Sequence, residues 1–291
     1  VYKRQAVDGA TSYQVTVSSG DGSQTLTANE AQCDIAEALT AGGEYAITVK
    51  ALAAGSESAD SAALVLNAVQ TKDQLAAVTN DKTANYLLID DINLDGAVDF
   101  DIADGNFTGT FDGNGHKIYN FNVAVGWQGL FYNLGGAKNA SGVIRNVTAH
   151  CTSFTTNTKN AILVAAVYGA GAVVDNCTVI ADEMHLTAAA QSNRANGTGL
   201  LAVTLLDGGV IRNCTEVGTY ASGTNAAALT RIAYAQGQQI FENNLSVYYN
   251  VPAGAFNSDT VNNVAADYTQ AAVEIEVDDT VQLASLDGYT L

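Results

Sequence analysis

The chain has 291 residues, and its 30 Asp and Glu against 12 Lys and Arg give a formal charge of −18 at pH 7. Such an acidic surface repels nucleic acid and anionic membranes, so we expect neither as a partner. Hydrophobic residues make up 47% of the chain, which is enough for a core. No apolar run approaches the roughly 20 residues of a membrane-spanning helix, so we expect no membrane insertion.

The first seventy residues contain short segments in which apolar and polar residues alternate. Residues 13–17 and 45–51 follow this period of two, which predicts β-strands. Leu39 precedes Tyr45 in a pairing that resembles the tyrosine corner of fibronectin type III modules, in which the phenol hydrogen-bonds to upstream backbone. The resemblance implies two earlier strands that are missing here. Residues 1–68 are therefore expected to form an incomplete β-sandwich within a fragment of a longer protein.

A phrase that ends in Asn recurs along the rest of the chain. Residues 209–215 (GVIRNCT) repeat residues 142–148 (GVIRNVT), and similar phrases lie between and around them. The Asn recurs every 20 to 37 residues, a spacing typical of stacked supersecondary units. Asn tolerates a left-handed backbone, and its amide can bond to the amide of the next coil, so we expect an inward-facing ladder at one corner. The predicted members are Asn120, Asn146, Asn176, Asn213, Asn243 and Asn263.

Each repeat also carries two apolar runs and a variable polar segment, which together predict three short strands per coil. The predicted fold class is all-β, with a right-handed three-sided parallel β-helix and a short N-terminal capping helix over residues 69–268, preceded by the incomplete β-sandwich. Residues 71–78 are expected to form the capping helix, with Thr71 at its start. Residues 269–291 are expected to provide a C-terminal strand, around 273–277, that begins a cap or another module.

The segment FTGTFDGNGHKIYNF at 107–121 resembles the opening of right-handed β-helix regions in bacterial surface proteins with GLUG-like repeats. The start of the GLUG phrase is kept at 129–131 and 199–201, although Tyr132 and Ala202 stand where its second Gly is expected. The resemblance covers about residues 70–268. It implies a fold far more than it implies an activity.

The residue before the Asn alternates in charge from one repeat to the next. The residues concerned are Arg145, Asp175, Arg212 and Glu242. Parallel strands lie about 4.8 Å apart, so correct register places each Arg beside an acid. An exposed pair of this kind contributes about 0.2–1 kcal/mol. We therefore interpret this charge ladder, like the Asn ladder, as a device that fixes register rather than as a catalytic motif.

The residue after the Asn is Cys177 in one repeat and Cys214 in the next, and Val147 and Phe121 are expected in the same slot. Two stacked coils are close enough for a disulfide, but parallel Cβ vectors give it poor geometry. Small buried core residues are therefore favoured over a disulfide.

Asp91, Asn93 and Asp95 match the first half of a calcium-binding loop, so Ca²⁺ is a possible cofactor. The closing Glu of that motif is absent, and an ordinary turn explains these residues equally well. Trp127, the only Trp, is a candidate for stacking on a sugar ring or for packing in the core. The other acids between residues 90 and 112 have Lys117 as their only basic neighbour in sequence, which does not match a lyase or hydrolase site.

The function expected from these features is that of a non-catalytic segment of a secreted or cell-surface bacterial protein. It would act outside the cell or at its surface as a scaffold for adhesion or glycan binding, with glycans or host and cell-surface proteins as partners. Two alternatives stay open: a polysaccharide-active β-helix enzyme, either a lyase or a glycoside hydrolase, and a purely structural stalk. Partner contacts are expected in the variable segments at 150–160 and 184–198. Asn146, Asn176 and Asn213 also lie in Asn-x-Thr sequons, but we expect ladder residues rather than glycosylation sites.

Overall fold

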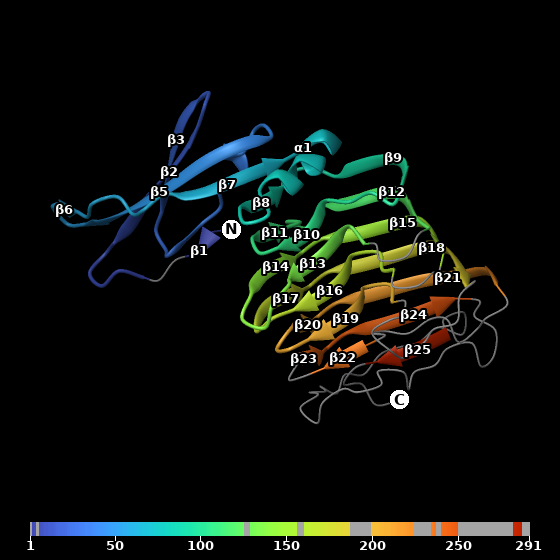
Figure 1. The fold of residues 1–291 in the computed structure, drawn as a ribbon. Coiled ribbons are helices and arrows are strands. Elements are labelled where there is room, and N and C mark those ends of the chain that lie inside the picture. Colours follow the sequence, from blue (N-terminus) through green and yellow to red (C-terminus); the bar gives the residue numbers. More distant parts are fainter. Residues whose placement is uncertain are drawn as a thin grey trace.

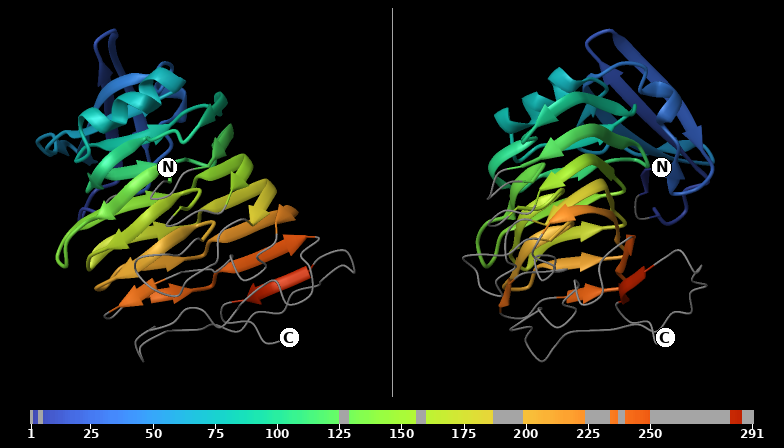
Figure 2. Two further views of the ribbon diagram at one scale, coloured as in Figure 1. Left: turned by 45° about the vertical axis from the view of Figure 1, so that its right-hand side comes forward. Right: turned by 90° about the vertical axis from the view of Figure 1, so that its right-hand side faces the viewer.

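The computed structural model describes residues 2–3, 6–124, 129–155, 160–186, 199–223, 234–236, 240–249 and 282–286. These residues form mostly β-strands and parallel sheets, with one short α-helix (Figure 1). An antiparallel module lies at the N-terminal end, and a stack of parallel strands follows it (Figure 2).

The N-terminal module is built on one antiparallel sheet, in which the strand order is β7–β5–β2–β3 and β6 pairs with β5. Alternation explains the main strands, since Tyr13, Val15 and Val17 are buried on one face of β2. A second, much smaller sheet consists of β1 and β4, which pair over two residues each. The elements of this region are β1 (Tyr2–Lys3), β2 (Ser12–Ser19), β3 (Gly22–Ala28), β4 (Gln32–Cys33), η1 (Ala36–Ala38), β5 (Gly43–Ala53), β6 (Ser56–Glu57) and β7 (Leu64–Val69).

The hydrogen bond expected at the corner of the module is present. The Tyr45 hydroxyl donates to the carbonyl oxygen of Ala41 at 2.9 Å, and Leu39 is buried beside it. This contact fixes the start of β5 against the segment that enters it. Ile35 and Ala38, in and beside η1, pack with Val17 and other buried residues of the main sheet.

The module and the stack share one sheet. β7 pairs in parallel with β8 (Asn85–Leu88), and β8 pairs in parallel with β11 (Thr110–Asp112). The antiparallel sheet of the module therefore continues without a break into the parallel strands, as the order β23–β20–β17–β14–β11–β8–β7–β5–β2–β3 records. We call this the mixed sheet. The domain boundary predicted at residue 68 falls inside β7, so the two parts are joined by backbone hydrogen bonds as well as by the chain.

In the stack, the chain enters three sheets in turn. Each strand therefore pairs in parallel with the strand three positions earlier in the chain, as β11 does with β8. The seven-stranded sheet has the order β25–β24–β21–β18–β15–β12–β9, and the five-stranded sheet has the order β10–β13–β16–β19–β22. The remaining strands belong to the mixed sheet. The further strands of all three sheets are β9 (Ile92–Val98), β10 (Ala103–Phe107), β12 (Lys117–Val123), β13 (Phe131–Gly135), β14 (Ser141–Arg145), β15 (Thr148–Thr155), β16 (Val164–Tyr168), β17 (Gly171–Asp175), β18 (Thr178–Leu186), β19 (Ala202–Leu206), β20 (Val210–Arg212), β21 (Thr215–Gly223), β22 (Tyr234–Gln236), β23 (Ile240–Glu242) and β24 (Leu245–Tyr249).

The core lies between the three sheets, and its first coils are rich in aromatic residues. Phe107, Phe111 and Phe131 are fully buried, and the ring of Phe131 lies 5.2 Å from each of the other two, centroid to centroid. Burial of such side chains stabilises the fold by about 1.5–3 kcal/mol each. The core therefore holds the coils together, and the corners decide their register.

A helix covers the first coil, as predicted. α1 (Lys72–Ala76) begins after Thr71. The Thr71 hydroxyl accepts a hydrogen bond from the Gln74 backbone N–H, and Gln74 Oε1 accepts one from the Thr71 backbone N–H. This capping box satisfies donors that a helix start leaves unpaired. The helix continues into η2 (Ala77–Asn80), and Leu75 and Val78 are fully buried in the core.

At the other end, β25 (Gln282–Leu286) adds antiparallel to β24, so the parallel growth of the seven-stranded sheet stops there. The predicted C-terminal strand at 273–277 lies outside the described residues, as do Asn263 and Trp127.

Candidate functional site: the asparagine corner

Two-residue corners connect the mixed sheet to the seven-stranded sheet in four successive coils. The first residue of each corner is Asn, and all four have a positive φ: Asn146 (54°), Asn176 (52°), Asn213 (55°) and Asn243 (54°). We call this column the asparagine corner. A left-handed residue turns the chain sharply between two strands, and Asn tolerates that conformation better than other side chains with a Cβ.

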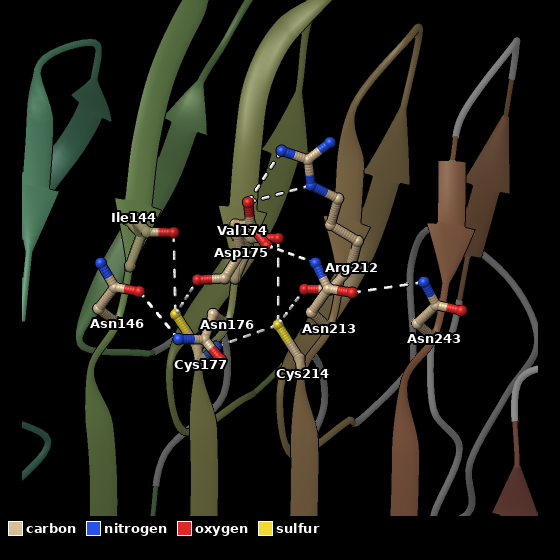
Figure 3. A network of polar contacts seen from close by, with 10 residues as sticks. All are labelled: Ile144, Asn146, Val174, Asp175, Asn176, Cys177, Arg212, Asn213, Cys214 and Asn243. Carbon is tan, nitrogen blue, oxygen red and sulfur yellow. Dashed lines mark hydrogen bonds and ion pairs between the residues drawn. The ribbon is translucent and has the colours of Figure 1, made fainter. Parts of the chain in front are cut away.

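Each amide in the column donates to the coil before it: Asn146 Nδ2 donates to Asp112 Oδ1 at 3.0 Å, and Figure 3 shows the other three bonds. Asn176 Nδ2 donates to Asn146 Oδ1 at 2.9 Å, and Asn243 Nδ2 donates to Asn213 Oδ1 at 3.3 Å. Asn213 Nδ2 instead donates to a carboxylate oxygen of Asp175 at 2.8 Å. The acceptor therefore alternates: where the preceding coil ends its strand with an acid, the amide bonds to the carboxylate, and where it ends with Arg, the amide bonds to the Asn.

The charge ladder has one more member than the sequence indicated. Asp112 pairs in register with Arg145, and the column continues through Asp175, Arg212 and Glu242. Arg145 Nε lies 2.8 Å from Asp112 Oδ2, and Arg212 contacts Asp175 Oδ2 through Nε at 3.0 Å and Nη2 at 2.8 Å. Each Arg thus bonds to the acid of the preceding coil. Asp112 was missed because Gly113 follows it where the later repeats have Asn.

Asp175 accepts three hydrogen bonds from the next coil, two from Arg212 and one from Asn213. Burial acts to raise the pKa of Asp175, but hydrogen bonds from Arg212 and Asn213 outweigh it and hold the pKa below its usual value. The same ion pair raises the pKa of Arg212. Both groups therefore stay charged near neutral pH, and the column is an electrostatic link between neighbouring coils.

Asn120 lies in a strand, unlike the four residues of the asparagine corner. The prediction that Asn120 belongs to this corner is wrong, because Asn120 lies inside β12, between residues that pair with His150 and Cys151 of β15. It is an extra, left-handed residue (φ 59°) in that strand, and its amide donates to Asn93 Oδ1 at 2.8 Å. Asn263, the other end of the predicted ladder, is outside the described residues.

The ladder asparagines lie on the surface rather than facing inward as expected. Asn176 and Asn213 are exposed, and Asn146 and Asn243 are half-buried. The core slot is occupied by the next residue along the chain, which is Val147, Cys177, Cys214 or Asn244, all buried. The corner therefore points the amides outward. Burial of these side chains consequently gives no reason to expect that the three sequons are not glycosylated.

All four cysteines have free thiols. The Cys177 and Cys214 thiols donate to backbone carbonyls, for example to that of Arg212 at 3.1 Å from Cys214 Sγ (Figure 3). Burial, together with the neighbouring Cys177, raises the pKa of Cys214 well above its usual value. Both side chains therefore act as small core residues. Phe121 does not share their slot, because it pairs with Cys151 in the seven-stranded sheet.

A polar groove with a volume of about 420 Å³ follows the corner across three coils. Its lining consists of Asn114, Gly115, Asn146, Val147, Thr148, Asn176 and Thr178. Thr148 and Thr178 occupy equivalent positions in β15 and β18, and Thr215 follows them in β21. The groove thus presents amides and hydroxyls at the repeat distance of parallel strands, about 4.8 Å. Such groups can donate to and accept from the hydroxyls of a sugar chain.

The residues of the predicted calcium loop make protein contacts. Asp91 Oδ1 accepts from the Lys117 backbone N–H at 3.0 Å, which is the main cause of a lowered pKa for Asp91. Asn93 Oδ1 accepts from the backbone N–H of Asp95, and Asp95 has a left-handed φ of 55°. Asp91 thus bonds to the next coil, and Asn93 and Asp95 belong to an irregular stretch of β9, where the register with β12 shifts. Among the described residues, no group of three or more His, Cys, Asp or Glu side chains is arranged to hold a metal ion.

Sequence reasoning missed a buried acid at the far end of the stack. Glu216 lies fully buried in β21 at the level where the two preceding coils have Val179 and Ala149. Its carboxylate accepts from Ser246 Oγ at 2.8 Å and from the Leu201 backbone N–H at 3.3 Å. These bonds join the seven-stranded sheet to the segment that enters β19. The only sequence signal is an acid at an inward position of an alternating strand.

The variable segments at 150–160 and 184–198 are described only in part. His150 lies in β15, where its Nε2 is 2.7 Å from Asp182 Oδ1, and His185 lies in β18, where its Nδ1 is 2.8 Å from Ser222 Oγ. Residues 156–159 and 187–198 are outside the described part of the chain.

No protein-family model, curated protein or solved structure matches this chain. No helix of the described residues is both long and apolar enough to cross a membrane.

Proposed function

We propose that this chain is a non-catalytic segment of a secreted or cell-surface bacterial protein, and that its groove along the asparagine corner binds glycans. The stack would be a right-handed three-sided parallel β-helix of the kind found in surface proteins with GLUG-like repeats. The module before it would be an incomplete fibronectin type III-like sandwich.

The observation that carries the proposal is the lining of the corner groove. Asn146 and Asn176 are held in place by their own hydrogen bonds, so their remaining lone pairs are presented in fixed positions. Thr148 and Thr178 add hydroxyl groups in register. A rigid row of such groups loses little conformational entropy when a ligand binds.

The charge of the chain indicates which glycans fit. With a net charge of −18, the molecule repels uronate and sialate polymers at moderate salt. Arg145, which precedes Asn146, is already bound to Asp112, and Lys117, whose backbone pairs with Thr148, is bound to Asp91. Neutral sugar chains are therefore the expected ligands.

A glycan array probed with the intact chain tests the proposal, followed by titration of the best neutral ligand against hydroxyl-deletion variants. Thr148→Val and Thr178→Val each remove one groove hydroxyl with little change of shape, and we expect each to weaken binding about two- to tenfold. Thr215→Val is the matched control, because Thr215 continues the same column but does not line the groove. Equal losses in all three variants would contradict the assignment of the site. Absence of glycan binding together with cleavage of uronate polymers would favour the lyase alternative, and absence of any ligand would favour a stalk.

A further inference from the structure

The outer face of the seven-stranded sheet continues the groove of the asparagine corner. Along β15, Thr148 and His150 are half-buried, whereas Ala149 between them is fully buried. Successive side chains of a strand point to opposite faces, so Thr148 and His150 share the outer face and lie about 7 Å apart along the strand. Thr178 and Ile180 repeat this arrangement in β18. A second row of outward side chains therefore runs beside the groove.

This second row is less polar than the groove. It consists of Tyr119, His150 and Ile180, which pair in register from β12 to β15 to β18, and we call it the outer row. Each of the three is half-buried, so each leaves part of its surface exposed. The His150 ring is held by Asp182, whose Oδ1 lies 2.7 Å from Nε2. Lys117 Nζ lies 5.0 Å from the centroid of the Tyr119 ring.

The groove and the outer row repeat in the same direction. Thr148 pairs with Thr178, and His150 pairs with Ile180, so each of these coils offers a hydroxyl and an aromatic or aliphatic side chain at the same level. The repeat is the spacing of parallel strands, about 4.8 Å. Equivalent groups recur along the stack and not along a strand. A ligand that uses both rows therefore lies across the strands, along the stack.

A chain of pyranose rings joined through equatorial bonds has matching chemistry. Each ring has two apolar C–H faces and a rim of hydroxyl groups. The equatorially linked chain is extended, and its length per ring is close to the strand spacing of about 4.8 Å. One face of each ring can pack on the outer row while the hydroxyls along one edge bond to the groove. A chain with axial linkages curls, so its rings cannot stay level with successive coils.

We propose that the corner groove and the outer row together bind an extended, neutral, β-1,4-linked glycan, with one ring on each of three coils and its long axis along the stack. The groove and the outer row both span the coils of β12, β15 and β18. Binding of this kind rests on the function proposed above, because the groove must bind sugars before the outer row can contribute. Ile180, which is outside the groove lining, then helps to determine which linkage is bound.

The test titrates the full chain with β-1,4-linked oligomers of glucose, mannose and N-acetylglucosamine, from two to six rings long. The controls are α-1,4-linked glucose oligomers of the same lengths. In at least one β-1,4-linked series, affinity should rise about two- to tenfold from two rings to three, and then level off, because three coils carry both rows. The α-1,4-linked series should bind about tenfold more weakly at three rings and show no such step.

Ile180→Thr and Val98→Thr are matched variants of the outer row. Both residues belong to the seven-stranded sheet, and both replacements keep a β-branched side chain. Val98 is 60% exposed on β9, but it pairs with Asn122 and lies outside the outer row. Ile180→Thr should abolish the gain from the third ring with little change in two-ring binding, because two rings can occupy the other two coils. Val98→Thr should change neither affinity, and thermal midpoints show that both variants are folded.

Three outcomes would overturn the proposal. In the first, α- and β-linked oligomers bind equally and Thr148→Val weakens both, so the groove binds sugars without selecting an extended chain. In the second, Ile180→Thr and Val98→Thr have equal effects, so the outer row does not contact the ligand. In the third, no neutral oligomer of either linkage binds, and the function proposed for the groove then fails as well.

Discussion

Asn176 allows the backbone and side-chain contributions of the asparagine corner to be measured separately. It has a left-handed φ of 52°, and its amide makes one described hydrogen bond, to Asn146 at 2.9 Å. Replacement by Gly or by Ala removes that bond equally, at a cost of about 0.5–1.5 kcal/mol. Ala also has to adopt a left-handed conformation, which costs about 1–2 kcal/mol more.

The greater freedom of Gly in the unfolded chain offsets about 0.4–1 kcal/mol of that difference. Asn176→Ala is therefore expected to be about 1 kcal/mol less stable than Asn176→Gly, and both less stable than the parent chain. Urea denaturation followed by circular dichroism measures the order of the three proteins.

Asn133 provides the control for this comparison. Its amide donates to Asn106 of the neighbouring coil at 3.0 Å, a bond like that of Asn176, but its φ is not positive. Asn133→Gly should therefore be no more stable than Asn133→Ala. If Asn176→Gly is as unstable as Asn176→Ala or more so, the argument that left-handed geometry selects Asn at the corner is refuted.

Three other perturbations have directions that the structure determines. Because the pKa of Asp175 is lowered in the folded protein, its contribution is present at neutral pH and is lost as pH falls through that lowered pKa. Asp175→Asn should cost about 1 kcal/mol or less at pH 7, and the stability difference should vanish in acid. Asp101 has the opposite sign, because burial, then Asp104 and Asp99, raise its pKa, so its charge destabilises the fold at neutral pH. Asp101→Asn should raise the thermal midpoint at pH 7 but not below the raised pKa, and an unchanged midpoint at both pH values would contradict this. Glu216→Val should cost about 1–3 kcal/mol because buried donors lose their acceptor, and adding Ser246→Ala should recover part of the loss in urea denaturation, whereas strict additivity would show that the two residues are not coupled.

Local features of the sequence determined most of the stack. The Asn of each repeat marks a left-handed corner because few residues adopt that conformation, and this holds at Asn146, Asn176, Asn213 and Asn243. The alternating charges before these residues indicated which strands pair, because each Arg meets an acid only when consecutive repeats are neighbours. If one repeat were skipped, Arg145 would lie beside Arg212. The helix that covers the first coil was also predictable, because Thr71 and Gln74 carry the capping box within four residues.

Long-range pairing decided what the local signals left ambiguous. The phrase around Asn120 looks like the others, but β12 pairs with β15 in a register that places Asn120 inside a strand, and Asp112 enters the charge column instead. No residue pattern signals that β7 and β8 pair in parallel, because this pairing depends on how the helix between them packs. The same holds for Glu216, whose place in the core depends on donors from Ser246 and Leu201. Sequence determines the conformation of a corner, whereas only the tertiary structure decides which corners and strands become neighbours.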